Sequence, residues 1–167
     1  VCSCNTNQNA TGEQNSDNDS VAAESTTGGE QSDITEEEYD SLYIVIADTG
    51  TDYFMLSSVM FKLSESLQLP VDTMGRFFNV KKNLIALPDN DEDEIYAGEY
   101  FPRRFPAENL SLEYLNSYEG KYGDKTIALV TGIFESESTA DSALARLKPL
   151  AKASFKIKAN VFLGCIH

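Results

Sequence analysis

The alternation of apolar and polar positions after residue 42 begins with a strand followed by a helix. Residues 43–47 (YIVIA) form a continuous apolar, β-branched run, which is typical of a buried strand. Residues 48–52 (DTGTD) interrupt this run and offer a turn glycine and helix N-cap side chains. From Tyr53 onward, apolar residues recur every three or four positions until Pro70, which predicts a helix with one buried face.

The last 42 residues repeat this order. Residues 126–134 (TIALVTGIF) form a second buried strand, and residues 138–141 (STAD) have the spacing of a capping box that starts a helix. From Phe155 to Leu163, apolar side chains alternate with polar ones, which predicts a strand with one buried and one solvated face. The chain therefore contains two strand–helix–strand units of similar length.

Between the two units lies an insertion at about residues 73–125. Residues 76–80 and 84–87 flank a polar turn and predict a hairpin, and residues 110–118 suit a short helix or an irregular strand. We expect an α+β fold, a ferredoxin-like βαβ–insertion–βαβ sandwich in which two helices pack on one face of a four-stranded antiparallel sheet. The other face is expected to be open unless the insertion covers it.

Charge divides the chain into an acidic segment and a nearly balanced body. Residues 1–42 contain ten acidic residues and no Lys or Arg, whereas residues 43–167 hold all 13 basic residues beside 17 of the 27 acidic ones. The acidic segment is rich in Asn, Ser, Thr and Gly, so we expect residues 1–42 to be a disordered tether and residues 43–167 to be a single domain. A body without net positive charge argues against nucleic acid as a partner.

The first four residues suggest a lipid anchor. Val1-Cys2-Ser3-Cys4 resembles the lipobox of bacterial lipoproteins, in which small residues precede the cysteine that receives the lipid. Cys4 would be the lipidated residue, and the protein would be held at the cell envelope, on the periplasmic side or at the outer membrane surface, with the lipid as its only contact with the membrane. The alternative is a fragment with a low-complexity leader and cysteines that are there by chance.

The second strand–helix pair resembles a known family. Val130-x-Gly132-x-Phe134 followed by Ser138-x-Ala140 is similar to the first strand and helix of sporulation-related repeat (SPOR) domains, although Val and Gly are one position closer here. The resemblance covers about 40 residues. It implies a ferredoxin-like fold that binds denuded peptidoglycan glycan strands across the open face of its sheet. The alternative function is a protein-interaction module of an envelope complex, which acts through residues 89–109.

The residues that could support catalysis or metal binding are few. Cys165 and His167 form the one Cys-x-His pair, without further ligands of the kind that zinc requires. Asp89-x-Asp91-x-Asp93 begins like a calcium loop, but Glu94 replaces the glycine at the sixth position. No acid–base pair can be named, so we expect a non-catalytic protein without a cofactor.

The candidate ligand-binding residues lie in the insertion, around the one adjacent arginine pair. Aromatic rings stack on sugars, and the planar guanidinium offers several donors to hydroxyls or carboxylates. The predicted site residues are Tyr96, Tyr100, Phe101, Arg103, Arg104 and Phe105. The alternative is structural: the aromatic residues pack the insertion onto the sheet, and the arginines pair with the acidic residues at 89–94.

Overall fold

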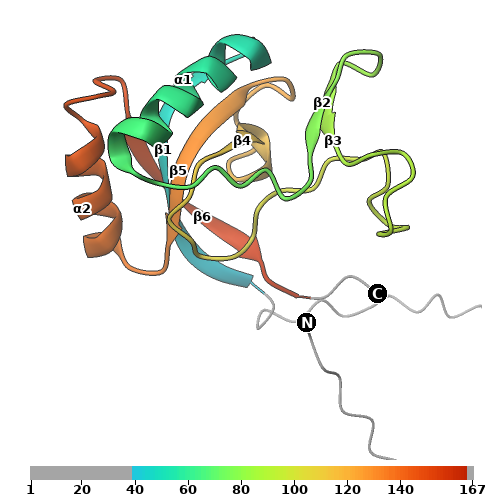
Figure 1. Ribbon diagram of the computed structural model, residues 1–167. Helices are drawn as coiled ribbons and strands as arrows, with labels where there is room; N and C mark the ends of the chain where they lie inside the picture. Colours follow the sequence, from blue (N-terminus) through green and yellow to red (C-terminus); the bar gives the residue numbers. More distant parts are fainter. Residues whose placement is uncertain (1–38, 165–167) are drawn as a thin grey trace, which may run out of the picture. The chain divides into compact units, whose positions relative to one another are not determined.

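The computed structural model describes residues 39–164, and it combines a four-stranded sheet, two α-helices and a separate two-stranded ribbon (Figure 1). Cys4, Cys165, His167 and the predicted tether up to residue 38 lie outside the described residues. The elements are, in chain order, β1 (Tyr39–Gly50), α1 (Tyr53–Leu67), β2 (Phe77–Asn79), β3 (Leu84–Ala86), β4 (Ser111–Tyr114), the 3₁₀ helix η2 (Leu115–Ser117), β5 (Ile127–Phe134), α2 (Glu137–Leu147) and β6 (Phe155–Phe162).

The main sheet has the strand order β4-β5-β1-β6, and every neighbouring pair is antiparallel. Consequently β1 and β4 run parallel to each other with β5 between them, and β5 and β6 run parallel with β1 between them. The predicted α+β class, with two helices and an antiparallel sheet, is confirmed. The first strand is longer than predicted at both ends. It begins at Tyr39, within the predicted tether, and continues to Gly50, within the predicted break at 48–52.

Side-chain caps fix where the two helices begin. Asp52 accepts a hydrogen bond from the backbone N–H of Met55 at 3.0 Å, which starts α1 as the sequence suggests. In α2 the cap is Ser136, whose hydroxyl accepts from the N–H of Thr139. The prediction of a capping box at 138–141 was therefore wrong by two residues. The hydroxyl at 136, and not the one at 138, accepts from a free N–H group at the start of the helix.

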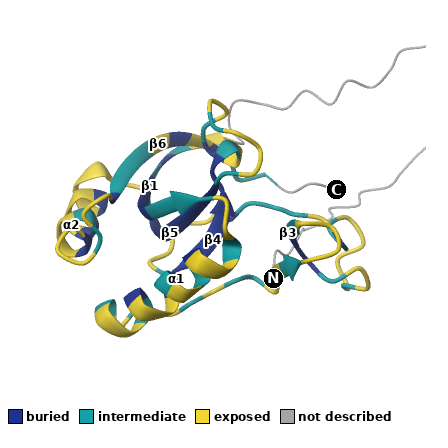
Figure 2. Ribbon diagram, turned by 90° about the horizontal axis from the view of Figure 1, so that it is seen from above, coloured by how far each residue is buried: buried dark blue, intermediate teal, exposed yellow. Residues whose placement is uncertain are grey.

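Both helices pack on the same face of the sheet (Figure 2). Their inward side chains meet β1, β4 and β5 in one apolar cluster, which includes Leu56, Met60, Leu63, Ala140, Ala143, Leu147, Val45, Ala47, Leu112 and Leu129. On the opposite face, Leu42, Ile44 and Ile46 are inaccessible to solvent and pack with Leu115 and Tyr118 of the insertion. The insertion therefore covers part of this face, which is the alternative that the sequence left open.

The hairpin predicted within the insertion is confirmed. It exists as β2 and β3 and forms its own ribbon, separate from the main sheet. The fourth strand of the sheet is β4, in the stretch that was predicted as a short helix or an irregular strand. The polar residues Ser111 and Glu113 are fully buried in β4, so the local pattern does not alternate as it does in a half-exposed strand.

Candidate functional site

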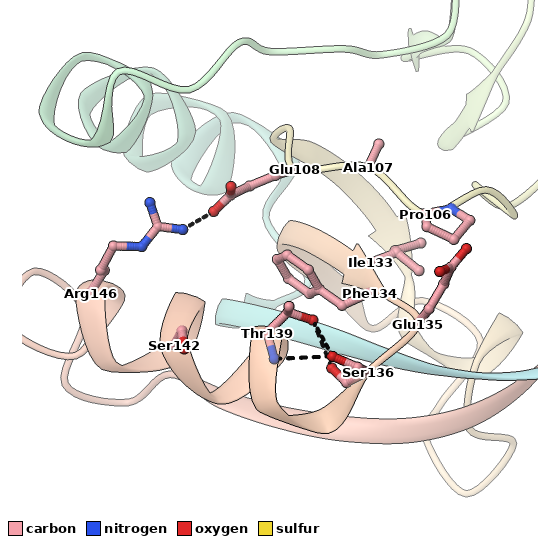
Figure 3. A pocket seen from close by; sticks show the side chains of 10 residues that line it. All are labelled: Pro106, Ala107, Glu108, Ile133, Phe134, Glu135, Ser136, Thr139, Ser142 and Arg146. Atoms are coloured by element: carbon pink, nitrogen blue, oxygen red, sulfur yellow. Dashed lines mark hydrogen bonds and ion pairs between the residues drawn. The ribbon is translucent and has the colours of Figure 1, made fainter.

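An open cleft of about 610 Å³ lies between the segment 106–108, the end of β5 and α2 (Figure 3). We call it the α2 cleft. It is lined by Pro106, Ala107, Glu108, Ile133, Phe134, Glu135, Ser136, Thr139, Ser142 and Arg146. The cleft is formed by a loop of the insertion on one side and by the second strand–helix pair on the other.

Gly132 leaves the space in which the ring of Phe134 lies. A Cβ atom at position 132 would be 2.5 Å from two ring carbons of Phe134, which is too close for any other residue to fit unless the ring moves. Beside Gly132, the pairing of β5 with β1 shifts register. The hydroxyl of Thr131 at this irregularity donates to the carbonyl of Val45 at 3.3 Å. The glycine and the bulge together place an aromatic ring against the cleft.

The opposite wall is held by backbone pairing. Ala107 and Ile133 exchange two N–H···O bonds of 3.0 Å, which fix the segment 106–108 alongside the end of β5. At the far end of the cleft, Arg146 of α2 forms an ion pair with Glu108 (Figure 3). The cleft is thus bounded by a ladder of main-chain bonds at one end and by an exposed ion pair at the other.

The polar groups of the cleft are hydroxyls and charged side chains. The hydroxyls of Ser136 and Thr139 lie 2.9 Å apart at the start of α2, and Ser142 donates to the carbonyl of Ser138 at 2.9 Å. The carboxylate of Glu135 has no ion-pair or hydrogen-bond partner among residues 39–164. An aromatic ring surrounded by hydroxyls, carboxylates and a guanidinium can bind a ligand by stacking and hydrogen bonding. Within the described part of the chain, no three His, Cys, Asp or Glu residues are placed to hold a metal ion.

Two of the predicted site residues, Tyr100 and Arg103, belong to a buried hydrogen-bond network around Glu113. Both guanidinium nitrogens Nη1 and Nη2 of Arg76 donate to the Glu113 carboxylate at 2.7 Å. The same carboxylate accepts from the Tyr100 hydroxyl at 2.9 Å, from the Ser111 hydroxyl at 2.6 Å and from the backbone N–H of Arg103 at 3.3 Å. We call these five residues the Glu113 network, and within the insertion it joins the segments around residues 76 and 100–103 to β4.

Burial and pairing have opposite effects on the charges of this network. Burial alone would raise the pKa of Glu113, but the hydrogen bonds and charge of Arg76 outweigh it and hold that pKa below its ordinary value. For Tyr100, burial and then the nearby charge of Glu113 raise the pKa. Burial lowers the pKa of Arg103, whose Nε and Nη2 have no acceptor among the described residues. Arg103 itself is only 3% exposed, so within this structure it faces the protein interior.

Arg104 lies in a second, smaller cleft of about 260 Å³, which we call the Arg104 cleft, and Tyr96 is a neighbour of its guanidinium. The guanidinium of Arg104 hydrogen-bonds the Tyr96 hydroxyl and the carbonyl of Gly164, and it lies 5.8 Å from the ring centre of Tyr96 and 5.6 Å from that of Phe162. The other lining residues were not indicated as site residues by the sequence: Tyr39, Pro102, Ser117, Tyr118, Asn160, Val161 and Phe162.

The two remaining aromatic residues of the predicted set lie apart from each other. Phe101 packs against Tyr96 at 5.0 Å, whereas Phe105 is 65% exposed. Neither Arg103 nor Arg104 forms an ion pair with the acidic residues at 89–94, so that part of the structural interpretation was wrong. Lys82 instead binds Asp89 at 2.6 Å. A ligand-binding role of the predicted residues stays a prediction.

Comparison with known proteins gives no relative for this chain. No protein-family model matches it, and neither a curated protein nor a solved structure is significantly similar to it. None of the helices in the described range is long and apolar enough to span a membrane. The residues of the α2 cleft were not indicated as a site by the sequence, although Gly132 and Phe134 belong to the stretch that resembles SPOR domains.

Proposed function

We propose that the chain is a non-catalytic module of the bacterial cell envelope that binds peptidoglycan glycan in the α2 cleft. The observation that carries the proposal is the position of the Phe134 ring, which Gly132 admits beside the hydroxyls at the start of α2. Gly132 and Phe134 also carry the resemblance to SPOR domains, which implies glycan as the ligand but places it on the open sheet face, a face that the insertion partly covers in this chain. The strand order, with two helices that each connect parallel strands across a neighbour, supports a ferredoxin-like arrangement.

The chemistry of the cleft suits a sugar chain. A pyranose ring presents C–H groups that pack against an aromatic face, and its hydroxyls bond to serine, carboxylate and guanidinium groups. The cleft of about 610 Å³ is large enough for a ligand of this kind. We propose further that lipidation of Cys4 and the acidic segment hold this body at the envelope, where such glycan is present.

The test is retention on amidase-treated sacculi, from which the peptides have been removed. Ser142→Gln places a larger side chain in the cleft at an exposed position of α2, and we expect retention to fall about tenfold because sugar contacts are blocked. Ser66→Gln is the matched control, since Ser66 is also exposed and donates to the carbonyl four residues earlier at 2.9 Å. Equal retention of the two variants, or none of the unchanged protein at low salt, would exclude the proposal.

A further variant in the same experiment tests the arginine site that the sequence predicts. Arg104→Ala removes the guanidinium from the Arg104 cleft without changing the α2 cleft. If glycan binds there instead, Arg104→Ala loses retention and Ser142→Gln does not.

A second candidate function is protein interaction through residues 89–109. The observation that favours it is the exposure of two large apolar side chains there, Ile95 at 54% and Phe105 at 65%. Copurification of a stoichiometric partner that is lost in Ile95→Ser/Phe105→Ser, while sacculus retention is unchanged, would support this function. Absence of any such partner from a cross-linked envelope extract would argue against it.

A further inference from the structure

The two edges of the main sheet differ in how their backbone groups are covered. At the β4 edge, the N–H of Tyr114 donates to the Tyr100 hydroxyl at 3.0 Å. Leu110, just before β4, exchanges backbone bonds of 2.8 and 2.9 Å with Pro70 and Asp72. The insertion and the segment after α1 therefore protect this edge from pairing with another chain.

The β6 edge has no such cover among residues 39–164. β6 is eight residues long and pairs with β1 in an unbroken register from Tyr39↔Phe162 to Ile46↔Phe155. No described segment pairs with its outer side, and β6 contains no proline or bulge. It lies at the side of the sheet opposite to β4 (Figure 2). A regular, long edge strand is a template for one further strand.

The charge around this edge is opposite to that of the chain as a whole. Residues 142–167 contain five basic residues and no acidic one, in a protein with a net charge of −14. Lys156 is already paired with Glu137 at 2.8 Å and with Asp141 at 2.5 Å. Lys148, Lys152 and Lys158 form no ion pair with a described carboxylate, so the edge keeps positive charge that is not neutralised within the domain.

We propose that the β6 edge is a docking site for an extended, acidic segment of a partner polypeptide, which would add to the sheet as a fifth strand. Main-chain hydrogen bonds would supply the affinity, as in other cases of strand addition. The lysines would determine which charge the partner strand can carry, because they repel a basic strand and attract an acidic one. Pairing with β6 of a second copy is disfavoured for the same reason, since it would bring lysines together.

The two faces of β6 define the pattern that the partner should have. Lys156 and Lys158 lie on the face that carries α2, as the bonds of Lys156 to that helix show. Phe155 and Ile157 lie on the other face, half-buried against the second apolar cluster. A partner strand should therefore alternate acidic with apolar residues, so that its carboxylates meet the lysines and its apolar side chains extend the cluster.

The probe is a fluorescein-labelled octapeptide of alternating Glu and Val, titrated into the full chain and followed by anisotropy. Two peptides serve as controls: one has Lys in place of Glu, and the other has the same composition with Glu and Val in separate blocks. Hydrogen exchange of the β6 amides is measured with and without the alternating peptide. We expect binding of the alternating peptide alone, together with slower exchange in β6 and not in β4.

A pair of matched variants separates docking at this edge from general charge attraction. Lys152→Glu/Lys158→Glu reverses two charges beside β6, and we expect about tenfold weaker binding because attraction is replaced by repulsion. Lys62→Glu/Lys81→Glu makes the same change of charge at exposed positions elsewhere and should weaken binding less than about twofold.

Three results would overturn the proposal. One is equal weakening in both variants, and another is binding without protection of β6. The third is self-association of the chain through β6 that the alternating peptide does not disrupt, which would make a second copy the occupant. None of these results depends on the α2 cleft, so this proposal and glycan binding can fail separately.

Discussion

Replacing Glu113 with glutamine should destabilise the domain strongly, although it changes only one atom group. The side chains of Glu113 and Arg76 are 0% and 1% exposed, so water cannot compensate for the lost charge. Glutamine keeps the shape of the side chain but leaves the Arg76 guanidinium buried without a counter-charge. Glutamine also has an NH₂ group, a donor, where glutamate has a second oxygen acceptor. This donor would face N–H or hydroxyl groups on every side.

Removal of one partner from a buried ion pair costs about 3–5 kcal/mol, which sets the size of the effect. A variant that removes both members of the pair, Arg76→Met/Glu113→Leu, should recover part of this loss because the Arg76 guanidinium is no longer buried without its counter-charge. The hydroxyls of Tyr100 and Ser111 and the backbone N–H of Arg103 lose their acceptor in that variant. We therefore expect recovery to be incomplete, by about 1–3 kcal/mol for each of these groups that finds no other partner. The pair would then show a large coupling energy in a double-mutant cycle.

The assay is urea unfolding followed by circular dichroism at neutral pH. Glu137→Gln is the control, because Glu137 is 60% exposed in its ion pair with Lys156 and its loss should cost less than about 1 kcal/mol. If Glu113→Gln destabilises the domain no more than Glu137→Gln does, the network does not hold the insertion as the contacts indicate.

Three further outcomes follow from the same contacts. The pKa of Glu113 is lowered from its usual value near 4.5, so the contribution of this carboxylate to stability is complete above that pH and is lost as the pH falls further. The free energy of unfolding, measured between about pH 6 and 3, should therefore change less steeply with pH in Glu113→Gln than in the unchanged protein. Gly132→Ala should displace the Phe134 ring rather than unfold the chain, at a cost of about 1–3 kcal/mol, and unchanged ring resonances in NMR spectra would contradict this packing. Ser136→Ala should cost about 1 kcal/mol in thermal melts through loss of the helix cap, whereas Ser138→Ala should have little effect, and the reverse order would restore the predicted cap.

The parts of the fold that follow local periodicity could be predicted from the sequence. The strand around Ile44, the helix after Asp52, and the strand that begins at Phe155 all appear where their apolar spacing places them. In each case the apolar residues lie on the face, or faces, that pack against neighbouring elements, and the spacing of these residues along the chain indicates which face that is. Together with β5 and α2, these elements supply three of the four strands of the main sheet and both helices. They are therefore enough to define the fold class.

The sequence left open whether the fourth strand, β4, would be a strand or a short helix, because its burial depends on a residue far away in the sequence. The local sequence predicts a solvent-exposed position for Glu113. It is buried in the structure because Arg76, which lies 37 residues earlier, neutralises its charge. The alternative in which the arginines pair with the acidic residues at 89–94 was wrong for a related reason: an arginine near acidic residues in sequence suggests an ion pair, whereas Arg103 in space meets the carbonyl of Asn109. Contacts of this kind are set by tertiary packing and leave no local periodicity.

The pairing of Tyr39 with Phe162 has a mechanical consequence. The first residue of β1 and the last residue of β6 are neighbours in the sheet, with ring centres 5.3 Å apart. A pulling force applied between these two points would load the antiparallel β1–β6 ladder one residue pair at a time, so that the strands separate like a zipper at low force.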